Sequence, residues 1–314
     1  MSNSPCDAKA IRLAVLALMV LALIWSYNWI LMKSVLRYVG ALDFTALRCA
    51  FGALVLMVML PLTGRSLKPP PWRPVLWIGL LQTAGMGGLG QLALVAGGAG
   101  KTAVLVYTMP FWVILLAALF LNEKPRLPQY AAMLIAAFGL LLVIQPWEWH
   151  GTLLSSLLAV GSGLAWAGGT IVAKRAFRHQ SVDLLSLLAW QMVVGAIVLS
   201  TLALATHKTE IVWSPTMLLV LGYNAVLSTA LAWALWLFIL RTLPTGVAGL
   251  SSLIIPVMSV LWAWWLLGER PDLAEGSGIV LILLALALLG GLGSLRTALR
   301  RFFASHRPPA SGHR

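Results

Sequence analysis

The side chains best suited to bind a small molecule lie inside long apolar stretches of the chain. They are aromatic rings and amides, namely Trp25, Asn28, Gln82, Tyr107, Trp166, Tyr223 and Trp233. Rings with a few amides suit a flat, largely apolar solute whose zwitterionic end is held by hydrogen bonds and helix ends rather than by a full charge. We expect these residues to bind such a substrate, with packing between helices as the alternative role for each one.

The acids and histidines do not form a pattern that predicts catalysis. Every Asp and Glu lies at the end of an apolar stretch or outside the stretches, and every His lies outside them. An intramembrane enzyme needs convergent acids, bases or metal ligands, so we expect no enzyme and no catalytic residue. Cys6 and Cys49 have no metal-ligand spacing, and we expect neither a metal nor a cofactor.

Two glycine-rich segments imitate nucleotide-binding motifs. Gly85–Gly90 matches the dinucleotide pattern, but it lies inside an apolar stretch and follows no strand. Gly97–Thr102 resembles a phosphate-binding loop, but Val95 stands where that motif needs its first glycine. We interpret the first segment as a site of close helix packing or a kink, since small residues let membrane helices approach each other.

The elements that carry these residues are membrane-spanning helices. Of 314 residues, 60% are hydrophobic and only 10% are charged, too few charges to cover a soluble domain. Ten runs are long enough to cross a bilayer and lack the alternation of β-barrel strands. The predicted fold is an all-α polytopic membrane protein with helices near 11–32, 41–62, 73–96, 101–121, 127–145, 153–173, 183–204, 215–240, 245–267 and 274–294.

The distribution of charge predicts the orientation in the membrane. Lys and Arg concentrate in the two tails and in the segments after the even-numbered runs. By the positive-inside rule, both termini are cytoplasmic. The net charge of +13 therefore reflects topology, and we expect the lipid bilayer as a partner and no nucleic acid.

The chain also repeats itself. Trp25 precedes Lys33 by the same interval that separates Trp166 from Lys174, and a proline stands thirteen residues before each of two glutamates, Pro110 before Glu123 and Pro256 before Glu269. Five helices per half place equivalent helices in opposite orientations, so the repeat is inverted. The expected segments are a tail at 1–10, a first five-helix repeat at 11–145, an extracellular linker at 146–152, a second repeat at 153–294 and a basic cytoplasmic tail at 295–314.

With these features the sequence resembles the drug/metabolite transporter superfamily in its EamA-type branch. The resemblance rests on the five-plus-five helices, the paired prolines and the exits Glu123-Lys124-Pro125 and Glu269-Arg270-Pro271. Within that branch it is most similar to the YddG-type exporters of aromatic amino acids. The resemblance implies that the two halves pack around a central cavity lined largely by helices 3, 4, 8 and 9.

Further roles follow from individual residues. Pro110 and Pro256 interrupt the helical hydrogen bonds in mid-membrane, and we expect both to act as hinges for gating. Arg48 lies inside the second run, where it could form an ion pair with Asp43 or belong to a gate, and we favour the ion pair. Tryptophans near run ends are expected to anchor at the membrane surface; these are Trp72, Trp147, Trp149, Trp213, Trp262, Trp264 and Trp265.

The predicted function is export of small organic solutes, most specifically aromatic amino acids, across the bacterial inner membrane by alternating access. The alternatives are an exporter of other metabolites or drugs, an intramembrane enzyme and a channel. No carboxylate lies near the centre of a run, which leaves downhill facilitation or coupling through groups that the sequence does not reveal. The oligomeric state is open, and a monomer is compatible with this interpretation.

Overall fold

The computed structural model describes residues 8–147, 153–178, 182–206, 210–242 and 254–305. Every regular element among these residues is helical. The first half contains α1 (Ala8–Ser34), η1 (Val35–Arg37), α2 (Ala41–Leu62), α3 (Trp72–Ile78), η2 (Gly79–Gly85), α4 (Met86–Ala96), α5 (Ala99–Val106), α6 (Met109–Leu121) and α7 (Leu127–Ile144). The second half contains α8 (Leu153–Ala176), α9 (Leu184–Thr206), α10 (Pro215–Gly222), η3 (Tyr223–Leu231), α11 (Ala232–Thr242), α13 (Ile254–Leu267) and α14 (Leu273–Ser305).

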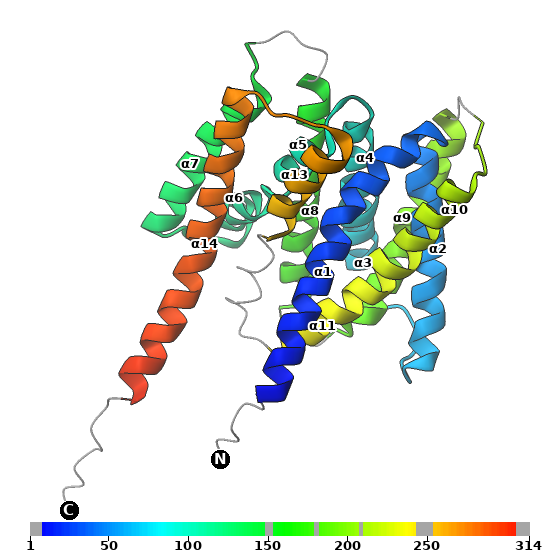
Figure 1. Cartoon of the computed structure of the whole chain (residues 1–314). Helices are drawn as coiled ribbons and strands as arrows, with labels where there is room; N and C mark the ends of the chain where they lie inside the picture. Colours follow the sequence, from blue (N-terminus) through cyan, green and yellow to red (C-terminus); the bar gives the residue numbers. More distant parts are fainter. Residues whose placement is uncertain (1–7, 148–152, 179–181, 207–209, 243–253, 306–314) are drawn as a thin grey trace, which may run out of the picture.

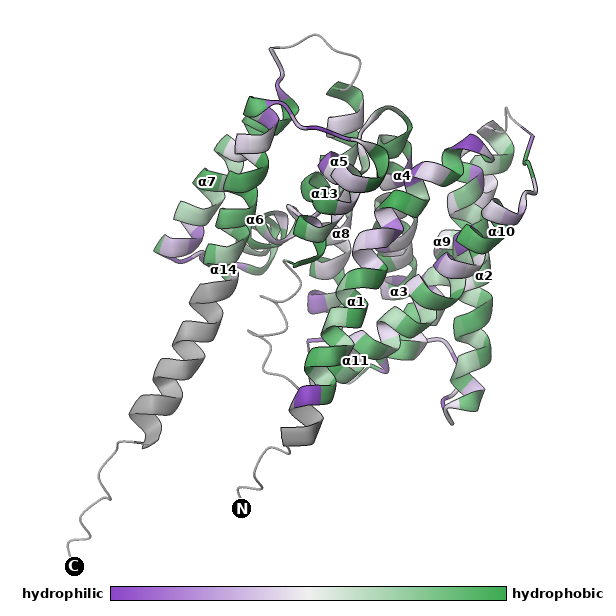
Figure 2. Cartoon of the chain, in the orientation of Figure 1, coloured by the Kyte–Doolittle hydropathy of each residue, from purple (hydrophilic) through white to green (hydrophobic). Residues whose placement is uncertain are grey.

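The predicted fold class is confirmed. Eight helices of the described chain are long and apolar enough to cross a membrane, and two shorter apolar helices, Ile254–Leu267 and Leu273–Leu289, supply the last two expected positions. The start of the expected ninth span, residues 245–253, lies outside the described residues. Figure 2 shows hydrophobic residues along the length of the helices. Helix α14 continues to Ser305, past the expected end of the last span at 294.

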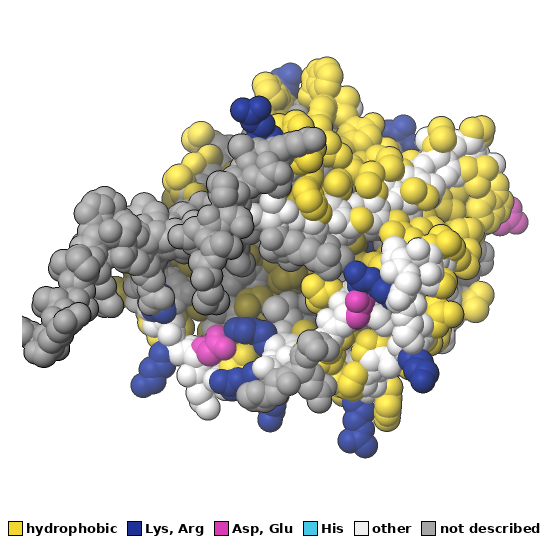
Figure 3. Space-filling model, turned by 90° about the horizontal axis from the view of Figure 1, so that it is seen from below, with side chains coloured by type: hydrophobic (Ala, Val, Ile, Leu, Met, Phe, Trp, Pro, Cys, Tyr) yellow, Lys and Arg dark blue, Asp and Glu magenta, His cyan; other side chains and the backbone are white. Residues whose placement is uncertain are grey.

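The helices stand side by side, and both ends of the described chain lie at the same end of the bundle (Figure 1). We call the end where α1 begins and α14 finishes the terminal end. The opposite end, where α4 finishes and α5 begins, is the distal end. Viewed from the terminal end, Lys and Arg side chains surround the molecule and outnumber the visible acids (Figure 3).

The packing of the two halves is reciprocal. Helix α1, the first helix of the first half, packs against α11 and α13 of the second half. Helix α8, the first helix of the second half, packs against α4 and α6 of the first half. The equivalent first helices therefore each pack against the third and fourth spans of the other half.

The third and eighth spans share a distortion that the sequence did not reveal. Each contains a π-helical segment between two α-helices, η2 at Gly79–Gly85 and η3 at Tyr223–Leu231. A π-helical segment widens the backbone and leaves irregular hydrogen bonds, and such segments are common at functional sites. The two segments lie at equivalent places in the repeat.

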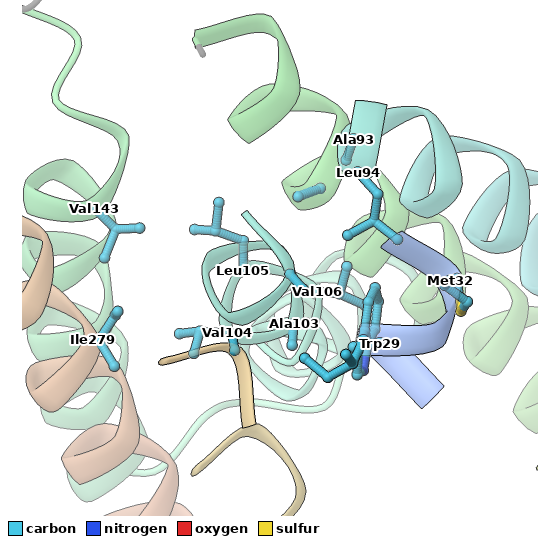
Figure 4. Packing of buried hydrophobic residues seen from close by; sticks show 14 of the residues in the cluster. Trp29, Met32, Ala93, Leu94, Ala103, Val104, Leu105, Val106, Val143 and Ile279 are labelled. Atoms are coloured by element: carbon cyan, nitrogen blue, oxygen red, sulfur yellow. The ribbon is translucent and has the colours of Figure 1, made fainter. Parts of the chain in front are cut away.

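Helix α5 lies at the centre of the hydrophobic core. Ala103, Val104, Leu105 and Val106 are completely buried, and Figure 4 shows them between Trp29 and Met32 of α1 on one side and Val143 and Ile279 of α7 and α14 on the other. Helices α7 and α14 cross closely at two glycines. A Cβ on Gly139 would lie 2.9 Å from the carbonyl oxygen of Gly278, so neither position has room for a side chain.

Candidate functional site

Aromatic side chains of α1 meet aromatic side chains of the second half. Trp25 packs edge-on against Trp233 of α11, with ring centroids 6.0 Å apart, and its centroid lies 6.3 Å from that of Trp236. Its indole Nε1 donates a hydrogen bond to the backbone oxygen of Ser228 in η3, at 3.1 Å. The structure thus brings two predicted site residues, Trp25 and Trp233, into contact at a joint between the halves.

A second set of rings continues this joint. The centroid of Tyr27 lies 6.2 Å from that of Tyr223 and 5.9 Å from that of Trp262. The Tyr223 hydroxyl donates to the backbone oxygen of Ile24 at 2.9 Å, and Trp262 Nε1 donates to Ser26 Oγ at 3.2 Å. We call Trp25, Tyr27, Tyr223, Trp233 and Trp262 the aromatic cluster.

The interpretation of Trp262 as a surface anchor is wrong, because its indole N–H bonds a fully buried serine of α1 inside the bundle. The other end-of-span tryptophans of the described chain are largely exposed, as anchors would be. These are Trp72, Trp147, Trp213, Trp264 and Trp265. Trp149 lies outside the described residues.

Beside the aromatic cluster, polar groups from four elements surround Met32. Asn28 Nδ2 donates to the Met32 sulfur at 3.1 Å, and Arg48 Nη1 lies 3.4 Å from the same atom. Arg48 Nη1 also donates to Asn224 Oδ1 at 3.2 Å, while Gln91 Nε2 donates to the Met32 backbone oxygen at 2.8 Å. We call Asn28, Met32, Arg48, Gln91 and Asn224 the polar cluster.

Several atoms of the polar cluster are buried without a hydrogen-bond partner in the described structure. They are Asn28 Oδ1, Arg48 Nε and Gln91 Oε1. Asn28 was among the predicted site residues, whereas Arg48 and Gln91 were not. A cation inside an apolar run was the available signal for Arg48, because such residues usually face a cavity or a partner. Its expected ion pair with Asp43 stays a prediction.

Gln82 and Trp166 meet at a different joint, between η2 and α8. Gln82 Nε2 donates to the backbone oxygen of Trp166 at 3.3 Å and to Thr170 Oγ1 at 2.9 Å. Gly169 makes this approach feasible, since a Cβ there would lie 2.4 Å from Gln82 Cγ. Among the described residues, no hydrogen bond or ring contact joins Gln82, Trp166 or the half-buried Tyr107 to the aromatic cluster.

The two prolines have different places in their helices. Tyr107 and Thr108 separate α5 from α6, and Pro110 lies in the first turn of α6, where a missing backbone N–H costs nothing. The fourth span is therefore two helices rather than one kinked helix. Pro256 is buried near the start of the described part of α13. The hinge role of both prolines stays a prediction.

Charged groups bond the backbone at the distal end, around the break between α4 and α5. Glu269 accepts hydrogen bonds from the backbone N–H groups of Ala99 at 2.7 Å and Gly100 at 3.1 Å. Lys33 Nζ donates to the backbone oxygens of Leu94 at 2.6 Å and Gly97 at 3.0 Å. An anion thus lies at the start of α5 and a cation at the end of α4, the placement that helix dipoles favour.

The equivalent residues at the terminal end are arranged differently. Glu123 and Glu269 both follow a residue with a left-handed backbone, Asn122 at φ 54° and Gly268 at φ 67°. Lys174, the equivalent of Lys33, bonds Glu123 directly at 2.9 Å, and both side chains are about half exposed. Lys33 and Glu269 therefore bond the ends of α4 and α5 at the distal end. Their equivalents Lys174 and Glu123 bond each other at the terminal end.

A cavity of about 390 Å³ opens beside Glu269, between α5, α7, α8 and the α13–α14 turn. Its polar lining includes Lys101, Gln145, Ser156, Glu269, Asp272 and Glu275. Asp272 accepts hydrogen bonds from Gln145 Nε2 at 3.0 Å and from the Glu275 backbone N–H at 2.8 Å. These two bonds hold the pKa of the Asp272 carboxyl below its usual range.

Comparison with known proteins agrees with the repeat. The model of the EamA-like transporter family matches residues 12–145 and, a second time, residues 153–291. The chain belongs to the EamA-like transporter family. This EamA-like protein is accordingly an integral membrane transporter, and its two matched stretches correspond to the two reciprocally packed sets of helices.

Individual relatives of this EamA-like transporter are distant but cover nearly its whole length. It is 26% identical over 279 residues to the uncharacterized transporter YoaV of Bacillus subtilis, covering 85% of this chain and 93% of that one. It is 28% identical over 281 residues to the threonine/homoserine exporter RhtA of Salmonella typhimurium, covering 86% and 87% of the two chains. Neither name mentions aromatic amino acids, so the narrower resemblance to YddG-type exporters stays a prediction.

A solved crystal structure shares the fold of this transporter. It superimposes with a TM-score of 0.63 at 20% sequence identity, covering 90% of this chain and 97% of the other. At that identity the likeness supports the fold alone.

Proposed function

We propose that this EamA-like transporter exports aromatic amino acids across the bacterial inner membrane by alternating access of its two halves. The observation that carries the proposal is the adjacency of the aromatic and polar clusters. Tyr27 and Asn28 are neighbours on α1, and Tyr223 and Asn224 are neighbours on η3. A solute bound at this joint would meet rings and amides together, which matches the ring and the zwitterionic end of an aromatic amino acid.

The charged groups at the two ends support the alternating-access part of the proposal. In an inverted repeat, the same contact can close one end in one conformation and the other end in the second conformation. Here Glu269 bonds the start of α5 and closes the distal end, whereas Glu123 pairs with exposed Lys174. We infer a conformation closed at the distal end, with Glu123 as the residue that closes the terminal end in the other conformation.

The orientation belongs to the same proposal. Lys and Arg side chains gather at the terminal end (Figure 3), and basic loops remain in the cytoplasm. The terminal end is then cytoplasmic and the distal end faces outward. Reporter fusions at either terminus should show cytoplasmic activity, and an external location of both reporters would reject this orientation.

A second candidate cargo is a small polar amino acid. The observation that favours it is the similarity to RhtA, whose name assigns it threonine and homoserine export. In that case the polar cluster would bind the cargo, and the aromatic cluster would serve mainly to join the halves. The two candidates share an amino acid head group and differ in the side chain, so one experiment separates them.

That experiment measures uptake of radiolabelled phenylalanine, tryptophan and threonine into liposomes that contain the purified transporter, with and without a pH gradient. Saturable uptake of phenylalanine or tryptophan supports the proposal, whereas uptake of threonine alone supports the second candidate. Dependence on the gradient distinguishes proton coupling from downhill facilitation. If none of the three enters faster than into empty liposomes while the protein stays folded, the amino acid proposal is wrong.

A further inference from the structure

Arg48 is a cation inside the second span whose neighbours in the polar cluster are neutral. It is the eighth residue of α2, roughly 10 Å along the helix from its start at 1.5 Å per residue. Its Nη1 group contacts a thioether and an amide oxygen, and its Nε group is buried with no hydrogen-bond partner in the described structure. A guanidinium at this depth is costly and usually serves a substrate or ion path.

The unpartnered atoms around Met32 have complementary character. Arg48 Nε is a donor, while Asn28 Oδ1 and Gln91 Oε1 are acceptors, and the three come from α2, α1 and α4. Gln91 is completely buried, and Asn28 is 8% exposed. One positive donor with two neutral acceptors is the complement of an α-amino acid head group, whose carboxylate accepts and whose ammonium donates.

The Met32 side chain contacts both Asn28 and Arg48, and its backbone oxygen accepts the hydrogen bond from Gln91. Its sulfur lies 3.1 Å from Asn28 Nδ2 and 3.4 Å from Arg48 Nη1, and sulfur is a weak acceptor. Methionine is unbranched and flexible, so its side chain can leave one packed position for another at low cost. A head group entering here would replace two weak contacts to sulfur with charge-assisted hydrogen bonds.

We propose that Arg48, Asn28 and Gln91 form the subsite for the cargo's head group, with Arg48 binding the carboxylate and the two amide oxygens binding the ammonium group. Met32 fills this subsite in the empty conformation. The inference rests on the proposed function insofar as the cargo is an amino acid, but it holds for aromatic and small polar side chains alike. It departs from the sequence-based expectation, in which no full charge held the zwitterionic end.

The test compares cargo with and without its charged groups in the same liposomes. Phenylalanine is measured beside phenethylamine, which lacks the carboxylate, and 3-phenylpropanoate, which lacks the ammonium group. Arg48→Gln should raise the KM for phenylalanine about tenfold or more, the loss expected for one charge-assisted hydrogen bond. The variant should also lose the preference for phenylalanine over phenethylamine. Arg175→Gln, which removes an exposed guanidinium of α8, is the matched control. It should leave unchanged both the KM for phenylalanine and the preference for phenylalanine over phenethylamine.

A second variant keeps the inference testable if Arg48→Gln does not fold. Met32→Ala empties the subsite, so we expect a several-fold lower KM for phenylalanine with its preference over phenethylamine intact. Threonine and its decarboxylated analogue replace the aromatic pair if threonine is the cargo. An unchanged KM and preference in folded Arg48→Gln, or an unchanged KM in Met32→Ala, overturns the subsite and leaves the proposed function standing. Absence of uptake of every amino acid by the wild type overturns both.

Discussion

Glu269 and Glu123 occupy equivalent places in the two halves but have different partners. Glu269 accepts hydrogen bonds from the start of α5, whereas Glu123 pairs with Lys174. Each follows a left-handed residue and bonds its backbone N–H to an alanine carbonyl six residues earlier, at 3.2 Å in both halves. The local backbone is therefore the same, and the difference lies in what each carboxylate reaches.

The distal closure depends on the absence of a side chain at residue 98. A Cβ on Gly98 would lie 2.7 Å from Glu269 Oε2, so Gly98→Ala should displace the carboxylate from the start of α5. We expect a loss of about 1 kcal/mol of stability, the usual effect of an anion at a helix start, and faster labelling of a cysteine introduced at the distal end. Thermal unfolding and labelling rates measure both. Gly161→Ala, whose Cβ would make ordinary contact with Leu89 at 3.6 Å, is the control, and equal behaviour of the two variants would refute the closure.

The indole N–H of Trp25 links the two halves through Ser228. Trp25→Phe keeps a ring at the joint and removes this hydrogen bond, so we expect a loss of about 1 kcal/mol of stability and slower uptake. Trp264→Phe is the matched control, because Trp264 lies on α13 with Trp262 but is 57% exposed. Thermal unfolding and initial uptake rates check the prediction, which fails if the Trp25 and Trp264 variants are indistinguishable.

Pro110 is expected to preserve a hinge between α5 and α6. Without the ring, residue 110 regains an N–H and the tendency to join the two helices into one. Pro110→Ala should therefore lower transport several-fold while the amount of folded protein in the membrane stays nearly constant. Pro61→Ala, at the end of α2, is the control. The measurement is the initial rate of uptake divided by the amount of folded protein in the membrane. A wild-type rate in Pro110→Ala would contradict the hinge role of Pro110.

Asp272 should make the stability of the distal end depend on pH. The bonds from Glu275 N–H and Gln145 hold its pKa below the ordinary value of 3.8. A lowered folded-state pKa means that the carboxylate stabilises the fold above pH 3.8, and that this stabilisation is lost as the pH falls through the folded value. Unfolding temperatures between pH 7 and pH 3 should therefore fall more for the wild type than for Asp272→Asn. Exposed Glu210→Gln should follow the wild-type curve, and parallel curves for all three proteins would contradict the prediction.

The candidate site could be predicted only in part. Trp25, Tyr223 and Trp233 were selected as rings within apolar runs, and the structure brings them together. Gln82 and Trp166 were selected by the same reasoning and meet at another joint. Arg48 was noticed as a cation inside a run but was assigned to an ion pair with Asp43. Gln91 was missed, because the rotation of a helix decides what a polar residue faces, and a uniformly apolar run does not reveal that rotation.

By itself, the sequence determined the class of fold, the positions of most spans and the repeat. These properties depend on local hydrophobicity, on turn residues and on spacing, all of which can be read along the chain. Only the tertiary structure decided that α1 and α8 cross to the opposite halves, that η2 and η3 are π-helical, and that Glu269 reaches α5 while Glu123 does not. Those features arise from contacts between residues far apart in the chain, and a one-dimensional pattern carries no information on which helix faces which.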